Sequence, residues 1–166
     1  MKRLTLLRHA KSSWGQPGLA DQDRPLNQRG KHDAPVMGRR LVAHGLRPSL
    51  IVTSPAKRAR QTAKLLAREI GYPIEFLQTE KSLYLADPAS ILTIIEAQED
   101  TFSDMVICAH NPGITALANQ LSGLTIDNVP TCGVVILEVD TNSWSDLAVS
   151  PRKCVAFDYP GKQIRA

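Results

Sequence analysis

Two arginines and two histidines stand just after short apolar runs of the sequence. Arg8 and His9 are adjacent, whereas Arg58 and His110 come much later along the chain. Arginine presents a planar fork of donors that matches phosphate oxygens, and it stays charged at every working pH. A neutral imidazole is a nucleophile, and an ordinary pKa near 6.5 makes that form available at neutral pH. Together, the four side chains would form a cationic pocket suited to a compact dianion such as phosphate.

Each of these four residues also has an ordinary structural explanation. His9 and His110 could cap a loop or pack in the core, as histidines after strands often do. Arg8 could form a surface ion pair, and Arg58 lies in a basic run that could be a solvated helix face. The functional interpretation therefore depends on all four residues occurring together, each near the end of an expected strand.

The apolar runs predict the strands that would position these residues. Met105–Cys108 is continuously apolar, which is typical of a strand buried on both faces. We expect strands over 4–7, 50–53, 74–77 and 104–109, and a final hairpin of two strands over 134–139 and 143–149. Helices of 10 to 18 residues between the first four strands predict a mainly parallel sheet. Ligands bind at the carboxyl ends of the strands in such sheets.

Capping residues and glycines set the expected helix boundaries. We expect a first helix over 27–44 with Asn27 as N-cap, and Pro35 either kinks it or lies in the first turn of a regular part that begins near Asp33; we favour the kink. We expect the other helices from Ser54-Pro55 to Gly71, over 88–98 with Asp87 as N-cap, and from Asn111-Pro112 to Gly123. A proline directly after a capping residue favours the first helical position. The predicted fold is an α/β three-layer α/β/α sandwich, with a mainly parallel sheet and an antiparallel edge hairpin.

The size and composition favour one globular domain over residues 1–166. The chain has 20 Lys and Arg against 16 Asp and Glu, a net charge of +4, and 43% hydrophobic residues. A length within roughly 100–200 residues suits one domain. No apolar run approaches the roughly 18 residues of a membrane span, and the start lacks the apolar core of a secretory signal. We therefore expect a cytoplasmic protein.

Metal, disulfide and nucleic-acid chemistry are not indicated. The three cysteines are widely spaced and odd in number, which fits neither a disulfide framework nor a zinc site, so we expect buried, reduced thiols at Cys108, Cys132 and Cys154. The basic residues are dispersed and aromatics make up only 5% of the chain, which disfavours nucleic-acid binding. We expect a monomer with no nucleic-acid or membrane partner, no metal and no cofactor.

Several segments resemble the histidine phosphatase (phosphoglycerate mutase-like) superfamily. The matching segments are Leu6-Leu7-Arg8-His9-Ala10, Thr53–Ala63 with its Ser-Pro-x-x-Arg-Ala-x-Gln-Thr-Ala pattern, Ala109-His110-Asn111-Pro112-Gly113, Asp23–Gly30, and Pro130-Thr131. The Asp23–Gly30 segment is similar to the short, SixA-like phosphohistidine phosphatase branch. Ala10 and Ala109 replace usual glycines, which is tolerable where φ is negative. The resemblance implies a phosphoglycerate mutase-like fold.

The resemblance also implies catalytic roles for the four residues. His9 would attack phosphorus to form a phosphohistidine, which water then hydrolyses, and no metal would be needed. Arg8 and Arg58 would hold the phosphoryl oxygens, and His110 would hydrogen-bond the transferring group. Arg24 would either reach the phosphate or pair with an acidic neighbour. Asp21 and Asp23 are interpreted as loop and helix-terminal charges, and Lys11 and Trp14 as candidates for the mouth of the groove.

Whether the site contains a general acid determines which leaving groups, and therefore which substrates, it can handle. Glu80 is a candidate acid with surface charge as the alternative, and Tyr84 and Asp87 are weaker candidates. The tryptophan-glutamate element of the mutases is missing. Phosphohistidine needs less help from an acid than a phosphate ester does, and the short chain has no lid insertion. We therefore expect an enzyme that dephosphorylates phosphohistidine on proteins. The alternatives are a phosphomonoesterase for a small metabolite and a non-catalytic module that binds phosphorylated ligands.

Overall fold

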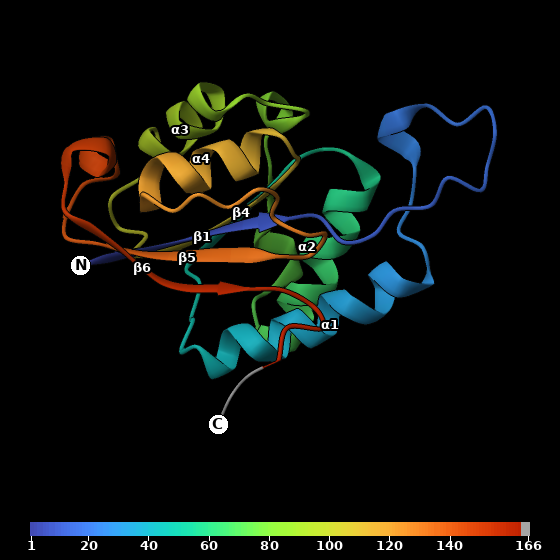
Figure 1. Ribbon diagram of the computed structural model, residues 1–166, viewed down its shortest axis with the longest axis horizontal. Coiled ribbons are helices and arrows are strands. Elements are labelled where there is room, and N and C mark those ends of the chain that lie inside the picture. The colour runs from blue at the N-terminus through green and yellow to red at the C-terminus, as the bar shows by residue number, and fades with distance from the viewer. Residues whose placement is uncertain (164–166) are drawn as a thin grey trace.

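One six-stranded sheet forms the middle layer of the protein (Figure 1). The computed structural model describes residues 1–163. The strands are β1 (Lys2–Arg8), β2 (Leu50–Thr53), β3 (Gln78–Thr79), β4 (Asp104–Ala109), β5 (Val134–Val139) and β6 (Arg152–Asp158), in the spatial order β3-β2-β4-β1-β5-β6. The first four strands run parallel to one another, and β5 and β6 are antiparallel to their neighbours. The predicted mainly parallel sheet is confirmed.

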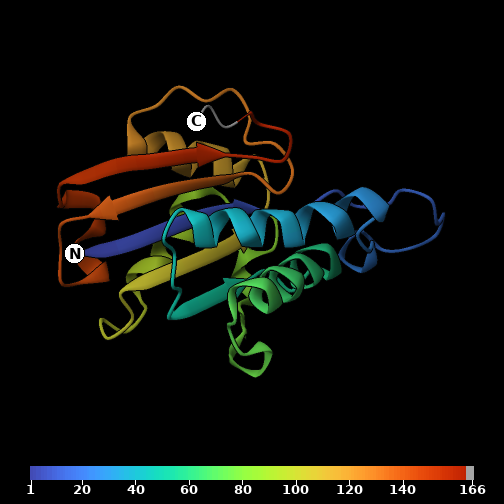
Figure 2. The same ribbon diagram turned by 90° about the horizontal axis from the view of Figure 1, so that it is seen from below.

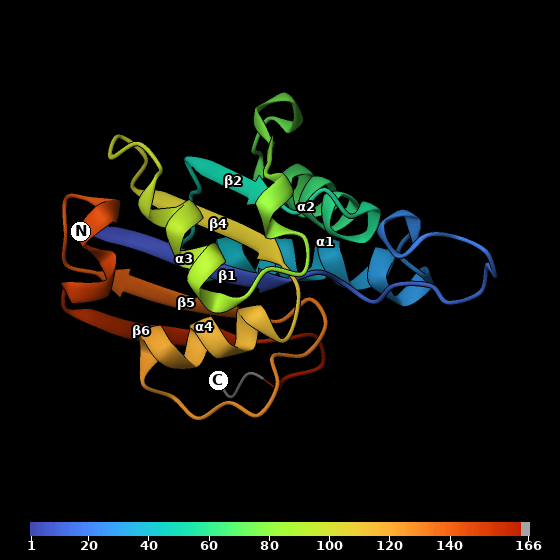
Figure 3. The same cartoon turned by 90° about the horizontal axis from the view of Figure 1, so that it is seen from above.

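Helices cover both faces of this sheet. The helices are α1 (Gln28–Ala43) and α2 (Lys57–Ile70) on one face (Figure 2), and α3 (Pro88–Glu96) and α4 (Gly113–Ser122) on the other (Figure 3). Short 3-10 helices span Asp21–Asp23, Ile74–Phe76, Lys81–Leu83 and Trp144–Val149. Each described helix is too short or too polar to cross a bilayer. The predicted three-layer α/β/α sandwich is confirmed.

The two helical layers divide the apolar core between them. Successive strand side chains point to opposite faces, so Leu6 packs among the residues under α3 and α4, while Leu7 packs with α1 and α2. Every residue of β2 and β4 is buried. These two strands could therefore be recognised from their continuous apolar runs.

The predicted capping residues set several helix boundaries. Asn27 accepts a hydrogen bond from the Gly30 amide at 2.9 Å, and Asp87 accepts one from the Ser90 amide at 2.8 Å. Helices α2 and α4 end at Gly71 and Gly123, whose φ values of 77° and 74° lie in the left-handed region. Pro35 lies inside α1, which continues to Ala43.

Two strand predictions were wrong. The apolar stretch 74–77 is a 3-10 turn, because the amides of Phe76 and Leu77 bond back to Pro73 and Ile74, and the strand is Gln78–Thr79 instead. Residues 144–149 also form a 3-10 helix. Its first residue, Trp144, is fully buried and donates its indole N–H to the Phe102 carbonyl at 2.8 Å.

The antiparallel edge exists, but β6 forms it. This strand pairs with β5 after a twelve-residue connection (140–151), not after a three-residue turn. Its residues alternate between half-buried and exposed over most of the strand, and a half-buried edge strand carries a weak apolar signal. The sequence pattern therefore predicted the edge strand in the more apolar segment before β6, residues 143–149.

Candidate active site

The carboxyl ends of three adjacent strands bring the four candidate residues together. Arg8 is the last residue of β1, His9 follows it, and His110 directly follows β4. Arg58 lies in the first turn of α2, shortly after β2. Because β4 lies between β2 and β1 in the sheet, these segments meet at one edge. They line a pocket of about 320 Å³ with Lys11, Ser12, Trp14, Asp21, Arg24, Leu85, Asn111 and Thr131.

His9 is held as a neutral imidazole in a defined tautomer. Its Nδ1 lies 2.8 Å from the Ala10 carbonyl oxygen. A carbonyl can only accept, so Nδ1 carries the hydrogen and Nε2 keeps a free electron pair. Burial, and to a smaller extent the nearby His110 and arginine side chains, lower the pKa of His9 to about 3, although the bond to Ala10 opposes this shift. His9 is therefore uncharged at neutral pH.

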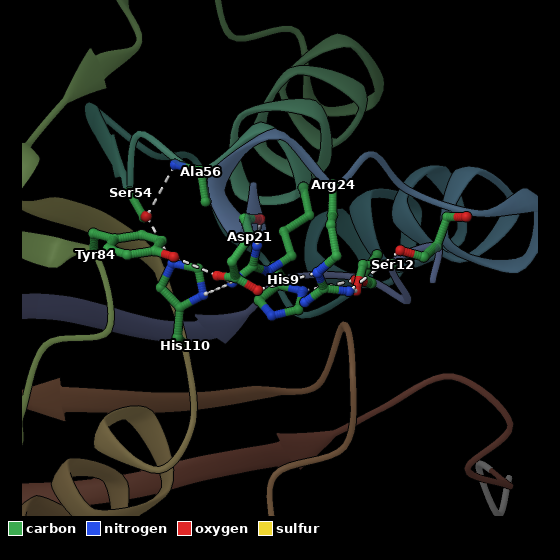
Figure 4. Close-up of polar contacts among 11 residues, drawn as sticks. His9, Ser12, Asp21, Arg24, Ser54, Ala56, Tyr84 and His110 are labelled. Atoms are coloured by element: carbon green, nitrogen blue, oxygen red, sulfur yellow. Dashed lines mark hydrogen bonds and ion pairs between the residues drawn. The ribbon is translucent and has the colours of Figure 1, made fainter. Parts of the chain in front are cut away.

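His110 lies beside His9, with the two ring centroids 5.1 Å apart. Its Nε2 lies 2.7 Å from the Ser54 hydroxyl oxygen (Figure 4). Its Nδ1 lies 3.4 Å from Nη2 of Arg58, which can only donate. Burial, followed by the charge of Arg58, lowers the pKa of His110 to about 4. Ser54 therefore orients the second histidine.

The role of Ser54 corrects the prediction that it caps the next helix. Helix α2 begins at Lys57, and its N-cap is Ala56, which makes no side-chain capping bond. The Ser54 hydroxyl instead accepts a bond from the Ala56 amide at 3.2 Å and contacts His110. A serine before a proline has the same sequence pattern in both cases, so the sequence alone could not distinguish them.

Both arginines have buried donors aimed at no protein acceptor. Arg58 is 3% exposed and binds Asp21 twice, through Nη1 to its carbonyl at 2.7 Å and through Nη2 to its carboxylate at 2.9 Å. Arg8 donates from Nη1 to the Val129 carbonyl at 3.0 Å. Within residues 1–163, Nε of each arginine is buried without a hydrogen-bond partner. A buried donor of this kind is costly unless an acceptor satisfies it.

Asp21 is a pocket residue that the sequence interpretation missed. Its carboxylate accepts hydrogen bonds from Arg58, from Arg24 Nε at 3.1 Å, and from the Tyr84 hydroxyl. The Tyr84 bond, followed by the two arginines, lowers the pKa of Asp21 to about 2. The carboxylate is therefore ionised at neutral pH. Its spacing of three residues from Arg24 was the available signal, but it did not reveal the contact with Arg58.

Arg24, Lys11 and Trp14 all line the pocket, for whose mouth Lys11 and Trp14 were the candidates. The Arg24 guanidinium forms the ion pair with Asp21 that was the alternative to phosphate binding. It also donates from Nη1 to the Ser12 hydroxyl at 2.7 Å and stacks 3.6 Å from the centroid of the Trp14 ring. Arg24 therefore holds the loop that follows β1 against the pocket.

The candidate acids lie in different surroundings. Glu80 accepts a bond from the Ser82 amide at 3.3 Å and is not among the pocket-lining residues of the described chain. Asp87 caps α3, and Tyr84 binds Asp21. In residues 1–163, no three His, Cys, Asp or Glu side chains form a group that could hold a metal.

The two alanines that replace the usual glycines fit without strain. Ala10 and Ala109 are fully buried. Among the described non-glycine residues only Leu85 and Cys132 have positive φ. Ala10 and Ala109 therefore have negative φ, which is the condition under which alanine can replace glycine at these positions.

The three cysteines are free, and Cys154 is only half-buried.

Solved structures share this fold over nearly the whole chain. A candidate phosphohistidine phosphatase SixA from Agrobacterium tumefaciens superposes with a TM-score of 0.81 and 28% identity, over 96% of this chain and 98% of that one. A protein histidine phosphatase SixA complexed with tungstate gives 0.80 and 17%, over 95% and 97%. A mycobacterial glucosyl-3-phosphoglycerate phosphatase gives 0.70 and 18%, over 96% and 100%. The last two similarities concern the fold alone.

The sequence comparisons agree with the structural ones. An uncharacterised protein of Mycobacterium leprae is 34% identical, over 93% of this chain and 99% of that protein. The model of the histidine phosphatase superfamily (branch 1) matches residues 4–80, which include Arg8, His9 and Arg58. The chain belongs to the histidine phosphatase superfamily, and its fold is that of the SixA-like members.

Proposed function

We propose that this protein is a metal-independent phosphatase that removes phosphate from phosphohistidine on proteins through a covalent intermediate at His9. The observation that carries the proposal is the state of His9: a neutral ring whose Nδ1–H is held by the Ala10 carbonyl at 2.8 Å, leaving Nε2 free. The guanidinium groups of Arg8 and Arg58 line the same pocket and would bind the phosphoryl oxygens.

In the first step His9 becomes phosphorylated. The Nε2 electron pair attacks phosphorus, and the bond from phosphorus to the leaving nitrogen of the substrate breaks, with its electrons staying on that nitrogen. Arg8 and Arg58 neutralise the charge on the phosphoryl oxygens, which dominates catalysis of phosphoryl transfer. In the described arrangement Arg58 Nη2 can only donate to His110 Nδ1, so His110 carries its hydrogen on Nε2 and donates it to Ser54. For His110 to donate to the phosphoryl group, the ring takes the other tautomer, with the Ser54 hydroxyl donating to Nε2 and Nδ1–H facing the phosphoryl oxygens.

In the second step water releases the phosphate. Phosphorylated His9 keeps its Nδ1–H on the Ala10 carbonyl, so the ring is a phosphorylated imidazolium. Water attacks phosphorus, the bond to Nε2 breaks, and His9 returns as neutral imidazole. Both hydrogens of the attacking water stay with the released group, which leaves as dihydrogen phosphate. The Ala10 carbonyl thus stabilises the charged intermediate and restores the nucleophilic tautomer.

The charge state of the pocket favours a phosphoramidate over a phosphate ester. An alkoxide leaving group needs a proton from an acid, and Asp21 is the one carboxyl group among the pocket-lining residues described. With a pKa of about 2, it carries no proton at neutral pH. A phosphohistidine protonated on its second ring nitrogen leaves as neutral imidazole and brings its own proton. The phosphomonoesterase alternative lacks such a donor.

Hydrolysis of free phosphohistidine and of glycerol phosphate by the purified protein tests this proposal. We expect kcat/KM for phosphohistidine to be at least about 100-fold higher, since a general acid contributes about 10²- to 10⁴-fold to reactions that need one. His9→Ala should release no phosphate and form no alkali-stable, acid-labile phosphoenzyme. Glu80→Gln should match the wild type.

Three results would contradict the proposal. Turnover by His9→Ala would exclude the covalent route. Comparable rates on the ester, lost in Glu80→Gln, would establish the phosphomonoesterase alternative. Tungstate binding without hydrolysis of either compound would show that the protein is a non-catalytic binding module.

A further inference from the structure

The rim of the phosphate pocket carries large apolar side chains that nothing covers within the described chain. Trp14 is 77% exposed and Leu85 is 56% exposed, and both line the pocket that contains His9. Single exposed apolar residues are ordinary on a protein surface, whereas apolar residues gathered at a functional site mark an interaction surface. We call Trp14 and Leu85 the apolar rim.

The structure holds Leu85 outward at a conformational cost. Its φ is 50°, in the left-handed region that a branched side chain rarely adopts. Its neighbours are anchored: Leu83 is fully buried, and the Tyr84 hydroxyl binds Asp21 in the pocket. The Ala86 carbonyl packs so closely on α4 that a Cβ at Gly113 would lie 2.0 Å from it. Such backbone strain persists only where its surroundings impose it, and it concentrates at functional sites.

Trp14 is held on the rim by the pocket itself. One face of its ring lies 3.6 Å from the guanidinium of Arg24, which is in turn fixed by the Asp21 carboxylate and the Ser12 hydroxyl. The loop around Trp14 is also tied down, since the Ser13 amide donates to the Pro25 carbonyl at 2.8 Å. The indole is therefore positioned by the side chain beneath it and still presents most of its surface to solvent.

We infer that the apolar rim is a docking surface for the folded protein domain that carries the phosphorylated side chain. The inference rests on the proposed function and adds a specificity determinant to it: Trp14 and Leu85 contact apolar residues around the phosphohistidine. Lys11 also lines this pocket and is exposed, so it adds a positive charge beside the rim that complements acidic residues on the same partner, whereas the charge of Arg24 is paired with Asp21.

A small metabolite fits this rim poorly. A sugar phosphate presents several hydroxyl groups, which need polar partners, whereas the two rim side chains offer a single donor, the indole N–H of Trp14. Tryptophan is enriched at the energetic centres of protein interfaces because it buries a large area with few rotatable bonds. The rim therefore matches an apolar protein surface better than a carbohydrate.

The test compares hydrolysis of phosphohistidine as a free compound with hydrolysis of phosphohistidine on the surface of a folded domain. The substrates are free phosphohistidine and a folded domain with one surface histidine, ringed by apolar and acidic residues and phosphorylated with phosphoramidate. We expect kcat/KM of the wild type to be higher for the domain. Trp14→Ala and Leu85→Asn should each lower the ratio of the two kcat/KM values about tenfold or more, the effect of removing an interface hot spot. Asparagine tolerates the left-handed backbone at position 85.

Two control variants remove exposed apolar groups elsewhere. Val149 is 84% exposed and Phe76 is 62% exposed, and neither lines the pocket, so Val149→Ala and Phe76→Ala should leave the ratio unchanged. An unchanged ratio in both rim variants, or a wild type with no preference for the folded domain, would overturn the docking surface while leaving phosphohistidine hydrolysis intact. Loss of hydrolysis on both carriers would instead refute the proposed function.

Discussion

At the scale of single residues, the proposed chemistry depends on keeping two histidines uncharged. His9 and His110 are 7% and 2% exposed, and burial is the main cause of the low pKa of each. The same shift that prepares a nucleophile makes protonation of the folded state unfavourable. Catalytic readiness and acid stability are therefore linked at these positions.

This linkage predicts a loss of stability in mild acid. The pKa values in the folded protein are about 3 for His9 and about 4 for His110, below the ordinary 6.5 of the unfolded chain. Below about pH 6.5 these two histidines bind protons in the unfolded chain but stay unprotonated in the folded protein. The free energy of unfolding therefore falls as the pH falls. The free energy of unfolding should drop by roughly 2 kcal/mol per histidine between pH 7 and pH 5.

Urea denaturation at pH 7, 6 and 5 measures this loss, and His9→Ala should remove about half of the part that the two histidines contribute. An identical pH dependence in the wild type and His9→Ala would show that His9 has the same pKa in the folded and the unfolded chain. In that case burial would not hold the imidazole in its neutral form, and part of it would be protonated near neutral pH.

Arg58 is predicted to be the main anchor for a phosphate mimic. Its guanidinium is 3% exposed and has a buried Nε without a partner in the described chain. Arg58→Ala should weaken inhibition by tungstate by about 100-fold, since losing a buried charge-assisted partner costs about 2–5 kcal/mol. The control is Arg60→Ala, because Arg60 is exposed on the same helix and binds the Pro55 carbonyl. Equal inhibition of Arg58→Ala and wild type would locate the anion elsewhere.

At the scale of elements, a close contact between α4 and the turn after residue 83 shapes the pocket. Gly113 begins α4, directly beside the segment that carries His110, and its Cα faces the Ala86 carbonyl. This contact fixes the distance between two sides of the site. It needs a residue without a side chain.

Gly113→Ala should therefore destabilise the protein and disturb the site together. The added Cβ would lie 2.0 Å from the Ala86 oxygen, and overpacking of this kind costs about 1–3 kcal/mol. Thermal denaturation and kcat/KM for phosphohistidine should both fall. Gly15→Ala is the control, because its nearest atom, Ser13 Oγ, lies at 3.4 Å. A Gly113→Ala protein of wild-type stability would show that the turn can move away freely.

The sequence predicted the elements better than the contacts between them. Strands β2 and β4 and the ends of α2 and α4 follow from apolar runs and glycines, which are local signals. The contacts of Ser54 with His110 and of Asp21 with Arg58 join residues 56 and 37 positions apart. No local pattern encodes such pairs. The same limit explains β6, whose edge position leaves little apolar signal, and Trp144, whose burial converts an expected strand into a 3-10 turn.

At the scale of the whole molecule, a single bound anion would contact side chains from distant parts of the chain. The pocket draws residues from the ends of β1 and β4, from α2 and from the loop after β1. A ligand that binds only the folded state stabilises it by about 2.7 kcal/mol at 100 times its dissociation constant. Tungstate at that concentration should raise Tm by roughly 5–10 °C.

Differential scanning fluorimetry of the wild type and Arg58→Ala measures this effect. The variant should lose the tungstate-dependent rise in Tm while its Tm without tungstate stays within the range of a folded protein. A rise of equal size in both proteins would mean that tungstate stabilises the fold without occupying the pocket.

The central position of β1 determines in which order activity and structure would be lost in denaturant. This strand is paired on both sides, with β4 and β5, and leads directly into His9. Amide protons in such a strand exchange with solvent only on global opening, whereas surface loops open far more often. The proposed nucleophile thus directly follows an interior strand of the sheet, whereas Asp21, which completes the pocket, lies in the loop after β1. In rising denaturant, activity should disappear while the sheet is still intact.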